Sequence, residues 1–456
     1  MPSDESMRAA ASLYTPEQRR AALRLALTGL AAASIEWFDF FLYATAAALV
    51  FPTVFFPASL PPYVALIASF SSFAVGFLAR PIGGALFGHI GDRKGRKVAL
   101  GSALLTMGVA TMLIGCLPSY ATAGVLAPLA LVLLRFAQGL AVGGQWGGAI
   151  LLATENAPEA RRGLYGSIPQ AGVAVGVVLT NLAFFVTNAL TSPAAFMAYG
   201  WRILFLCSIA LVALAAFIHF RIEDTAAFRE LKQAQPAGAL APRERSPLLQ
   251  SLRRHPRSIL LAAGAYISTN LTFYILITYS VAYGTSPAGL HLSRATLLAA
   301  VLIATLLATP ALFIGGALSD RVGRRRIFML GLCMEGVWAF ALFPLIDTRS
   351  FVAITLAICV GQVCNSVTYG PLAALFAELF DTRVRYSAVS LAYQLSSIVG
   401  GGLAPLIATA LYARYHHNLP LSIYIVAACA VSVLCTWALQ EPRNARPISA
   451  ILQGGT

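Results

Sequence analysis

Three ionisable residues lie deep inside long apolar stretches of this sequence. Glu36 and Asp39 fall within the stretch 24–50, roughly 18–23 Å along it if the stretch is helical, and their i,i+3 spacing places both on one helix face. Arg135 reaches a similar depth in the stretch 122–153. A charge at such depth in an apolar medium costs several kcal/mol and is retained mainly where it pairs or works.

A desolvated carboxylate beside a second one could take up a proton near neutral pH. We therefore expect Asp39 or Glu36 to carry a proton, with Arg135 as its counter-ion or as a clamp for a substrate carboxylate. The alternative is a static ion pair that only fixes how the helices pack. Arg80, nearer the end of its own stretch, is expected to extend toward the membrane interface.

Amide and aromatic side chains gather in a few of the same stretches, and a small polar solute would need such donors and acceptors. Any single one could equally hydrogen-bond a neighbouring helix. The candidates for substrate binding are Arg135, Gln138, Gln145, Trp146, Gln170, Asn181, Asn270, Tyr274, Gln362, Asn365, Tyr369 and Gln394.

The composition identifies the elements that position these residues. Of 456 residues, 58% are hydrophobic and only 11% are charged; a soluble domain averages about 45–50% and about 25%. This excludes an ordinary soluble globular enzyme. Stretches of 18 or more apolar residues predict membrane-spanning helices, since about 20 residues cross the hydrocarbon core. Twelve are predicted, at 24–50, 63–89, 98–117, 122–153, 164–190, 201–220, 257–283, 293–318, 327–346, 350–376, 387–413 and 420–440.

The net charge of +14 is a signal of topology. Most of the 32 Lys and Arg residues fall at the two termini and in alternate loops, which predicts that these segments and both termini are cytoplasmic. A nucleic-acid partner is therefore not expected. The seven cysteines form no CxxC pair and no cluster with histidine, so neither a metal site nor a disulfide framework is predicted.

The chain divides into two similar halves. Residues 88–97, Gly-His-Ile-Gly-Asp-Arg-Lys-Gly-Arg-Lys, recur as 316–325, Gly-Ala-Leu-Ser-Asp-Arg-Val-Gly-Arg-Arg. We predict a cytoplasmic tail at 1–23, a six-helix half at 24–220, a cytoplasmic linker at 221–256, a second six-helix half at 257–440 and a tail at 441–456. Duplicated bundles of this kind place their substrate site near the membrane midplane, between the halves.

These motifs resemble the major facilitator superfamily: D-R-x-G-R-[KR] in both halves, and R-x-x-Q-G at Arg135, Gln138 and Gly139. More narrowly, Glu36-Trp-Phe-Asp39 and residues 139–148 resemble its metabolite/proton symporters, which include shikimate, α-ketoglutarate, citrate and proline/betaine transporters. The resemblance implies an all-α fold of twelve transmembrane helices in a 6+6 pseudo-symmetric arrangement. Relatives commonly have Glu where this chain has Gln145; if that Glu carries a proton in them, this protein must use another carboxylate or couple differently.

The resemblance also implies that charge clusters at the cytoplasmic ends hold the halves together when the carrier faces outward. The residues of this predicted gate are Asp92, Arg93, Arg96, Glu155, Arg162, Asp320, Arg321, Arg324, Glu378 and Arg385.

No GxxxxGK[ST], HExxH or GxSxG motif occurs, so neither ATP hydrolysis nor covalent catalysis is indicated. The sequence predicts a secondary transporter in a bacterial inner membrane, importing a small polar metabolite with protons by alternating access. An organic acid of the shikimate or dicarboxylate type is favoured. The alternative is a zwitterion such as proline or glycine betaine; a drug/proton antiporter or a non-transporting sensor is less favoured. The expected partners are lipid, the solute and the proton, with no cofactor, and a monomer is expected to suffice.

Overall fold

The computed structural model describes residues 16–94, 96–143, 153–154, 157–209, 213, 256–287, 289–380 and 385–439. Throughout these ranges the regular structure is helical. Eight of the helices are long and apolar enough to cross a membrane, and two shorter apolar helical segments, Gly101–Cys116 and Leu126–Val142, accompany them.

The N-terminal half begins with the 34-residue helix α2, which carries both carboxylates of the first predicted span. Its helices are α2 (Pro16–Leu49), α3 (Phe51–Val54), α4 (Pro62–Lys94), α5 (Arg96–Cys116), α6 (Tyr120–Ala123), α7 (Leu126–Val142), the short 3-10 helix η1 (Glu159–Arg161), α9 (Arg162–Leu190), α10 (Pro193–Ala195), the π-helical turn η2 (Phe196–Gly200) and α11 (Trp201–Leu206).

The C-terminal half has the same succession of long helices, two of them interrupted by π-helical turns. Its elements are α15 (Pro256–Tyr274), η3 (Ile275–Tyr279), α16 (Ser280–Thr285), α17 (Arg294–Val322), α18 (Arg324–Asp347), α19 (Phe351–Leu379), α20 (Arg385–Ser396), η4 (Ser397–Gly402), α21 (Ala404–Tyr415) and α22 (Leu419–Ala438). Each of the twelve predicted spans overlaps one or more of the described helices.

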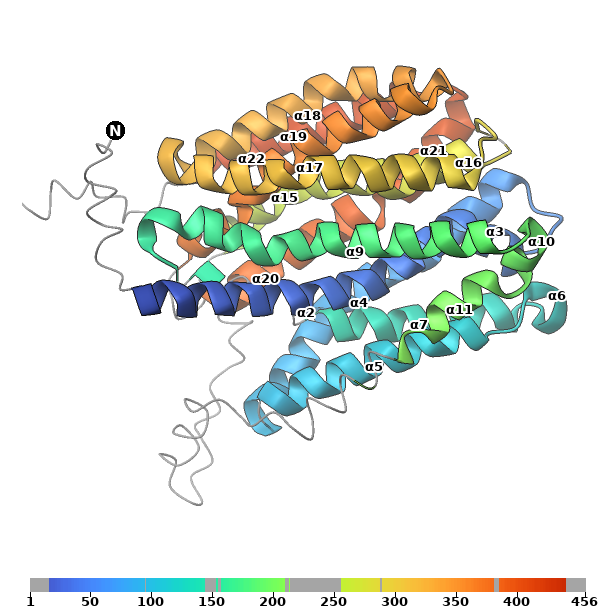
Figure 1. The fold of residues 1–456 in the computed structure, drawn as a ribbon, viewed down its shortest axis with the longest axis horizontal. Helices are drawn as coiled ribbons and strands as arrows, with labels where there is room; N and C mark the ends of the chain where they lie inside the picture. Colours follow the sequence, from blue (N-terminus) through green and yellow to red (C-terminus); the bar gives the residue numbers. More distant parts are fainter. Residues whose placement is uncertain are drawn as a thin grey trace, which may run out of the picture.

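The halves meet along α9, which packs against α2 of its own half and against α17 and α19 of the other. Figure 1 shows α9 running between the blue helices of the N-terminal half and the yellow and orange helices of the C-terminal half. A second seam joins α4 to η4 and α21. The candidate site lies between these two seams.

Small residues allow the backbones to approach closely, as packing in lipid requires. At the crossing of α4 and α7, a Cβ placed on Gly139 would lie 2.1 Å from the carbonyl oxygen of Gly76. Only glycine fits at that position. The close crossing brings Arg135, one turn earlier on α7, against α4, and the neighbouring Gln138 against α5.

Candidate functional site

Asp39 is fully buried on α2 and accepts hydrogen bonds from two hydroxyls. Thr111 of α5 donates to Oδ2 at 2.5 Å, and Ser208, just beyond α11, donates to Oδ1 at 2.7 Å. Both donors are neutral, so they stabilise a negative charge without cancelling it. A carboxylate in such a place can alternate between the ionised and the protonated form if a proton can reach it.

Arg135 is joined to this carboxylate through two intermediate side chains. Its Nη1 donates to Gln138 Oε1 at 3.1 Å, and Gln138 Nε2 donates to Thr111 Oγ1 at 2.5 Å. Within the described residues no ion pair shorter than 4.0 Å links Arg135 directly to Asp39. Arg135, the predicted counter-ion of Asp39, is therefore connected to this carboxylate only indirectly, through hydrogen bonds of Gln138 and Thr111.

Aromatic rings surround the guanidinium of Arg135. Its Cζ lies 4.2 Å from the ring centroid of Tyr43, 4.6 Å from that of Phe40 and 5.0 Å from that of Phe73. Ring faces attract cations, with gains of about 0.5–2 kcal/mol or more when the pair is desolvated. The rings thus hold a buried cation without neutralising it.

Arg80 occupies a second position of the same kind, and the expectation that it extends to the interface is wrong. It is 1% exposed, with Cζ 4.2 Å from the ring of Phe77 and 4.7 Å from that of Phe40. Its side chain turns inward because these rings offer a cation a better environment than the aliphatic surface along α4. In both Arg80 and Arg135, Nε and Nη2 have no hydrogen-bond partner among the described residues.

Glu36 lies one turn before Asp39 but has different surroundings. It is 9% exposed and is attracted electrostatically to Arg80. The two carboxylates on one helix face therefore have separate partners, Glu36 with Arg80 and Asp39 with the Arg135 chain. The buried charges of the N-terminal half form two acid–base couples.

A cavity opens between the halves, directly beside this charged region. Trp37 and Tyr274 line it, and Arg80 Cζ lies 6.0 Å from the ring of Trp37. Among the described residues, none that lines the cavity carries a charge. The lining is Trp37, Gln170, Val173, Ala174, Tyr266, Thr269, Asn270, Phe273, Tyr274, Thr305, Thr309, Leu312, Gln362, Asn365, Ser366, Tyr369 and Tyr393.

Half of the predicted substrate-binding residues line this cavity: Gln170, Asn270, Tyr274, Gln362, Asn365 and Tyr369. Arg135 and Gln138 belong instead to the Asp39 chain. Asn181 bonds the carbonyl of Val177 in its own helix at 2.9 Å, and Gln394 bonds the carbonyl of Gly143 across the halves at 3.2 Å. Gln145 and Trp146 lie outside the described residues.

The sequence analysis did not single out Glu335, a fifth buried acidic or basic residue besides Glu36, Asp39, Arg80 and Arg135. It lies on α18, is 2% exposed and accepts hydrogen bonds from α15 and α19. A signal was available, because Glu335 is a lone acidic residue inside the apolar stretch 327–346. A depth argument like the one applied to Asp39 selects it.

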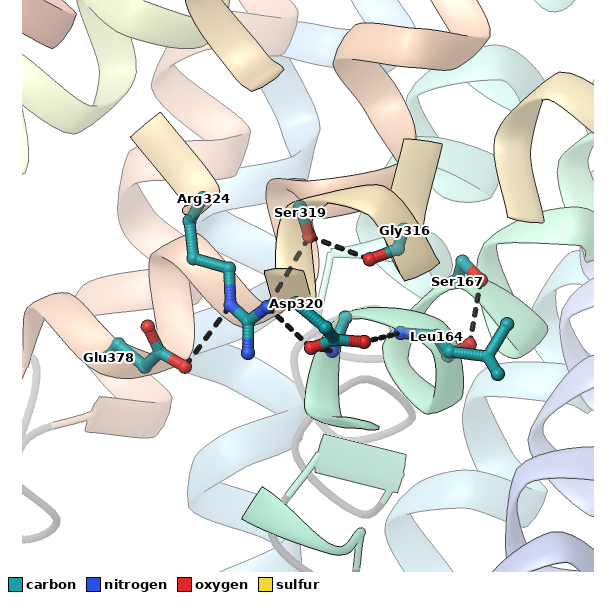
Figure 2. Close-up of polar contacts among 8 residues, drawn as sticks. Leu164, Ser167, Gly316, Ser319, Asp320, Arg324 and Glu378 are labelled. Carbon is teal, nitrogen blue, oxygen red and sulfur yellow. Dashed lines mark hydrogen bonds and ion pairs between the residues drawn. The ribbon is translucent and has the colours of Figure 1, made fainter. Parts of the chain in front are cut away.

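Asp320, at the end of α17, joins the two halves at the end of the molecule that the sequence predicts to be cytoplasmic. Its Oδ1 accepts the backbone N–H of Gly163 at 2.9 Å, and its Oδ2 accepts that of Leu164 at 3.0 Å. These are orphan donors of the first turn of α9, where a negative charge also meets the positive end of the helix dipole. Figure 2 shows the carboxylate directed at this helix end.

Arg324 completes the cluster from the C-terminal half. It pairs with Asp320, and its Nε lies 3.4 Å from Glu378 Oε1 (Figure 2). Of the other predicted gate residues, Arg162 begins α9 and Arg321 is exposed. Glu155 and the side chains of Asp92, Arg93, Arg96 and Arg385 lie outside the described part of the structure.

Comparison with known proteins agrees with this architecture. The family profile described as Major Facilitator Superfamily matches residues 40–405 and 260–453. The chain belongs to the major facilitator superfamily. It is an integral membrane protein, and its all-α fold is the fold of this superfamily.

Curated transport proteins match this chain over most of their length. The inner membrane metabolite transport protein YhjE of Escherichia coli K12 is 38% identical over 434 residues, covering 94% of this chain and 96% of that protein. The shikimate transporter of the same strain is 37% identical, covering 93% and 96%, and its proline/betaine transporter is 32% identical, covering 93% and 85%.

Among solved structures, a D-xylose-proton symporter has the same fold, with a TM-score of 0.71 at 18% sequence identity over 92% of this chain and 98% of that one. Family and relatives together identify this superfamily member as a secondary transporter and not an enzyme.

Proposed function

We propose that this protein imports a small organic acid together with protons. The observation that carries the proposal is the charged region beside the cavity. Arg80 and Arg135 are both 1% exposed and both leave Nε and Nη2 without a partner among the described residues. Buried N–H groups of a cation without a hydrogen-bond acceptor are unfavourable, so a carboxylate that reached them would bind with a gain.

The charge balance supplies a reason for coupling. Two carboxylates, Glu36 and Asp39, face two guanidinium groups, Arg80 and Arg135. With all four ionised the region is neutral and offers an organic anion little net attraction. Protonation of one carboxylate leaves an excess charge of about +1, which the anion then compensates. Proton and anion thus favour each other's binding, which is the thermodynamic requirement for symport.

Asp39 is the better candidate for the proton carrier. It is fully buried and its hydrogen bonds come from hydroxyls, whereas Glu36 has no such donors among the described contacts and is attracted to Arg80. Symport of one proton with one monovalent anion moves no net charge, so the pH difference drives import: one pH unit supplies about 1.4 kcal/mol, roughly tenfold in concentration.

Alternating access requires contacts that close each end of the cavity in turn. The Asp320 cluster joins the halves at the cytoplasmic end. At the other end, Arg294 of α17 lies over the ring of Phe196, with its Cζ at 5.3 Å from the centroid, and Nη2 lies 3.3 Å from Met197 Sδ. We infer that the two ends open alternately by rocking of the halves. The orientation with both termini cytoplasmic, the division into domains at 24–220 and 257–440, and function as a monomer are part of the same proposal.

The relatives support an organic acid, since one of them is a shikimate transporter at 37% identity. The second candidate is a zwitterion with a quaternary ammonium group, in line with the proline/betaine relative. One structural observation favours it: six aromatic side chains line the cavity, and ring faces bind quaternary ammonium groups. This lining holds Trp37, Tyr266, Phe273, Tyr274, Tyr369 and Tyr393.

Uptake into proteoliposomes separates these candidates. Purified protein is reconstituted, and accumulation of labelled shikimate, a dicarboxylate and glycine betaine is measured with and without an inward proton gradient. We expect an organic acid to accumulate only with the gradient, and Arg135→Gln to abolish its binding while leaving the protein folded. Accumulation of betaine alone would establish the second candidate. Accumulation that ignores the gradient would overturn proton coupling.

A further inference from the structure

Glu335 is a buried acid that the proposed function does not use. Ser268 of α15 donates to its Oε2 at 3.0 Å, while Asn365 and Thr368 of α19 donate to its Oε1 at 3.1 Å and 3.2 Å. Within the described residues no cation pairs with it. Its environment therefore resembles that of Asp39, a buried carboxyl group held by neutral donors.

The packing of α18 explains why these donors converge. The buried positions of α18 form one stripe, with Gly331 one turn before Glu335 and Ala339 one turn after it. A Cβ on Gly331 would lie 2.2 Å from Thr368 Oγ1, so the glycine lets α19 approach closely and brings Thr368 and Asn365 to the carboxyl group.

The two halves contain this arrangement in exchanged form. In the N-terminal half, the carboxylate Asp39 is on the first long helix and its hydroxyl donor Thr111 is on the third. In the C-terminal half, the hydroxyl donor Ser268 is on the first long helix and the carboxyl group of Glu335 is on the third. Each half thus joins its first and third helices by one buried acid and one hydroxyl. The N-terminal pair is the proposed proton site, which suggests the same role for its counterpart.

Asn365 connects Glu335 with the cavity. Its side chain lines the cavity, and its Nδ2 donates both to Glu335 Oε1 and to the carbonyl oxygen of Thr269 at 2.7 Å. Both hydrogens of that amide are thereby used inside the protein, and Oδ1 is the remaining polar atom of the side chain. A change in the protonation of Glu335 therefore reaches the cavity through one side chain, that of Asn365.

The network can accept a proton without leaving a donor unpaired. When Glu335 is ionised, Ser268 donates to Oε2. When a proton from solution binds Oε2, this O–H donates to Ser268 Oγ, and the Ser268 hydroxyl turns to Cys429 Sγ, 2.9 Å away. The titratable groups near Glu335 are the thiols of Cys364 on α19 and Cys429 on α22; α15 contributes hydroxyls, and no acidic or basic side chain of α17 pairs with it in the described structure.

We propose that Glu335 is a second proton-binding site, in the C-terminal half, and that Asn365 transmits its protonation to the substrate cavity. The protein then takes up two protons for each organic anion, one in each half. The first part stands on the geometry of Glu335 alone; the second part rests on the proposed function.

Infrared difference spectroscopy of the full-length protein tests the first part without any ligand. Spectra taken at about pH 6 and about pH 9 report carboxyl groups that titrate in this range, through the C=O stretch of the protonated form; exposed carboxylates are ionised at both pH values. We expect Glu335→Gln to remove one component of the band. Glu17→Gln, which removes an exposed carboxylate on α2, is the control and should leave the band unchanged. An identical band in Glu335→Gln and the unmutated protein would overturn the proposal.

Ser268→Ala keeps the test decisive if Glu335→Gln does not fold. It removes the hydrogen bond to Oε2 but retains the acid, so the Glu335 component should change its frequency and keep its intensity. An unaltered spectrum would contradict the assignment. The shift of the Glu335 component also separates a titrating acid from a merely structural one, because a group that never changes protonation contributes no difference band.

The second part is tested with shikimate as the probe. Proton uptake on binding is measured with a pH-indicator dye in weakly buffered detergent solution. We expect about two protons for the unmutated protein and about one for Glu335→Gln. Equal proton uptake by both proteins would refute the coupling through Asn365. If shikimate does not bind at all, the proposed function fails for this solute, and the infrared result still decides the role of Glu335.

Discussion

Replacing Asp320 by Asn should shift the protein toward the state that is open to the cytoplasm. The carboxylate uses both oxygens on the first turn of α9, at 2.9 and 3.0 Å, and also pairs with Arg324. An amide of the same shape keeps one acceptor oxygen, so it loses one backbone hydrogen bond and the negative charge that faces Arg324 and the helix dipole. The second helix-end N–H is then left facing an NH₂ group.

The size of the effect follows from these contacts. A hydrogen bond to a charged group contributes about 1.5–3 kcal/mol. The ion pair joins two residues of the C-terminal half, so it persists when the halves separate and adds little to the difference between the two states. Water satisfies all these groups once the end opens, so we take about 2 kcal/mol for the difference between the two states. This corresponds to roughly a thirty-fold shift in their ratio, because 1.4 kcal/mol is about tenfold.

Distances between spin labels at the cytoplasmic end measure this ratio. Labels at the exposed positions Arg161 and Arg326 report on opposite halves, in a background without the native cysteines. The control is Arg321→Gln, which removes an exposed charge next to Asp320 and should leave the distance distribution unchanged. If Asp320→Asn gives the same distribution as the unmutated protein, the contact does not hold the halves together and the reasoning is wrong.

Three further substitutions test other parts of the site. Asp39→Asn should abolish accumulation driven by a proton gradient while preserving exchange of substrate across the membrane, which counterflow measures; full accumulation would eliminate Asp39 as the carrier. Gly163→Ala places a Cβ 2.4 Å from the carbonyl oxygen of Gly316 and should separate α9 from α17. We expect a larger cytoplasm-open population in the spin-label assay. The control is Gly101→Ala, whose Cβ meets nothing within 4 Å and should leave that population unchanged. Gly76→Ala places a Cβ 2.5 Å from Arg135 Nε and should displace the guanidinium. We expect organic-anion binding to weaken by about tenfold. Unchanged affinity in calorimetry would show that Arg135 does not contact the anion.

The sequence predicted the spans well because a membrane imposes a length of about 20 apolar residues on each of them. It also predicted the amide side chains of the cavity in the C-terminal half, Asn270, Gln362 and Asn365, since amides deep in apolar stretches seldom face lipid. Both predictions depend on position along one helix, which the sequence gives directly.

What the sequence could not give is the rotation of each helix and its lateral neighbours. Arg80 lies near a span end, where snorkelling is the ordinary outcome, and only the rings of Phe40 and Phe77 make the inward orientation favourable. Asn181 lies at a plausible depth but satisfies itself within its own helix. The indirect link between Arg135 and Asp39 depends on where α5 places Thr111, a fact of three-helix packing.

Under the proposed function, proton coupling and solute recognition are divided between the halves. The described acid–base couples beside the cavity, Glu36 with Arg80 and Asp39 with Arg135, come from the N-terminal half, whereas most polar groups that line the cavity come from the C-terminal half. Substitutions in the first set should therefore change the dependence on protons, and those in the second should change which solute binds. Glu335 is the exception, because it is an acid in the half that recognises the solute, one side chain from the cavity. If its protonation changes the position of Asn365, then the choice of solute itself depends on pH, and this dependence should disappear in Glu335→Gln while the response of Asp39 to a proton gradient persists.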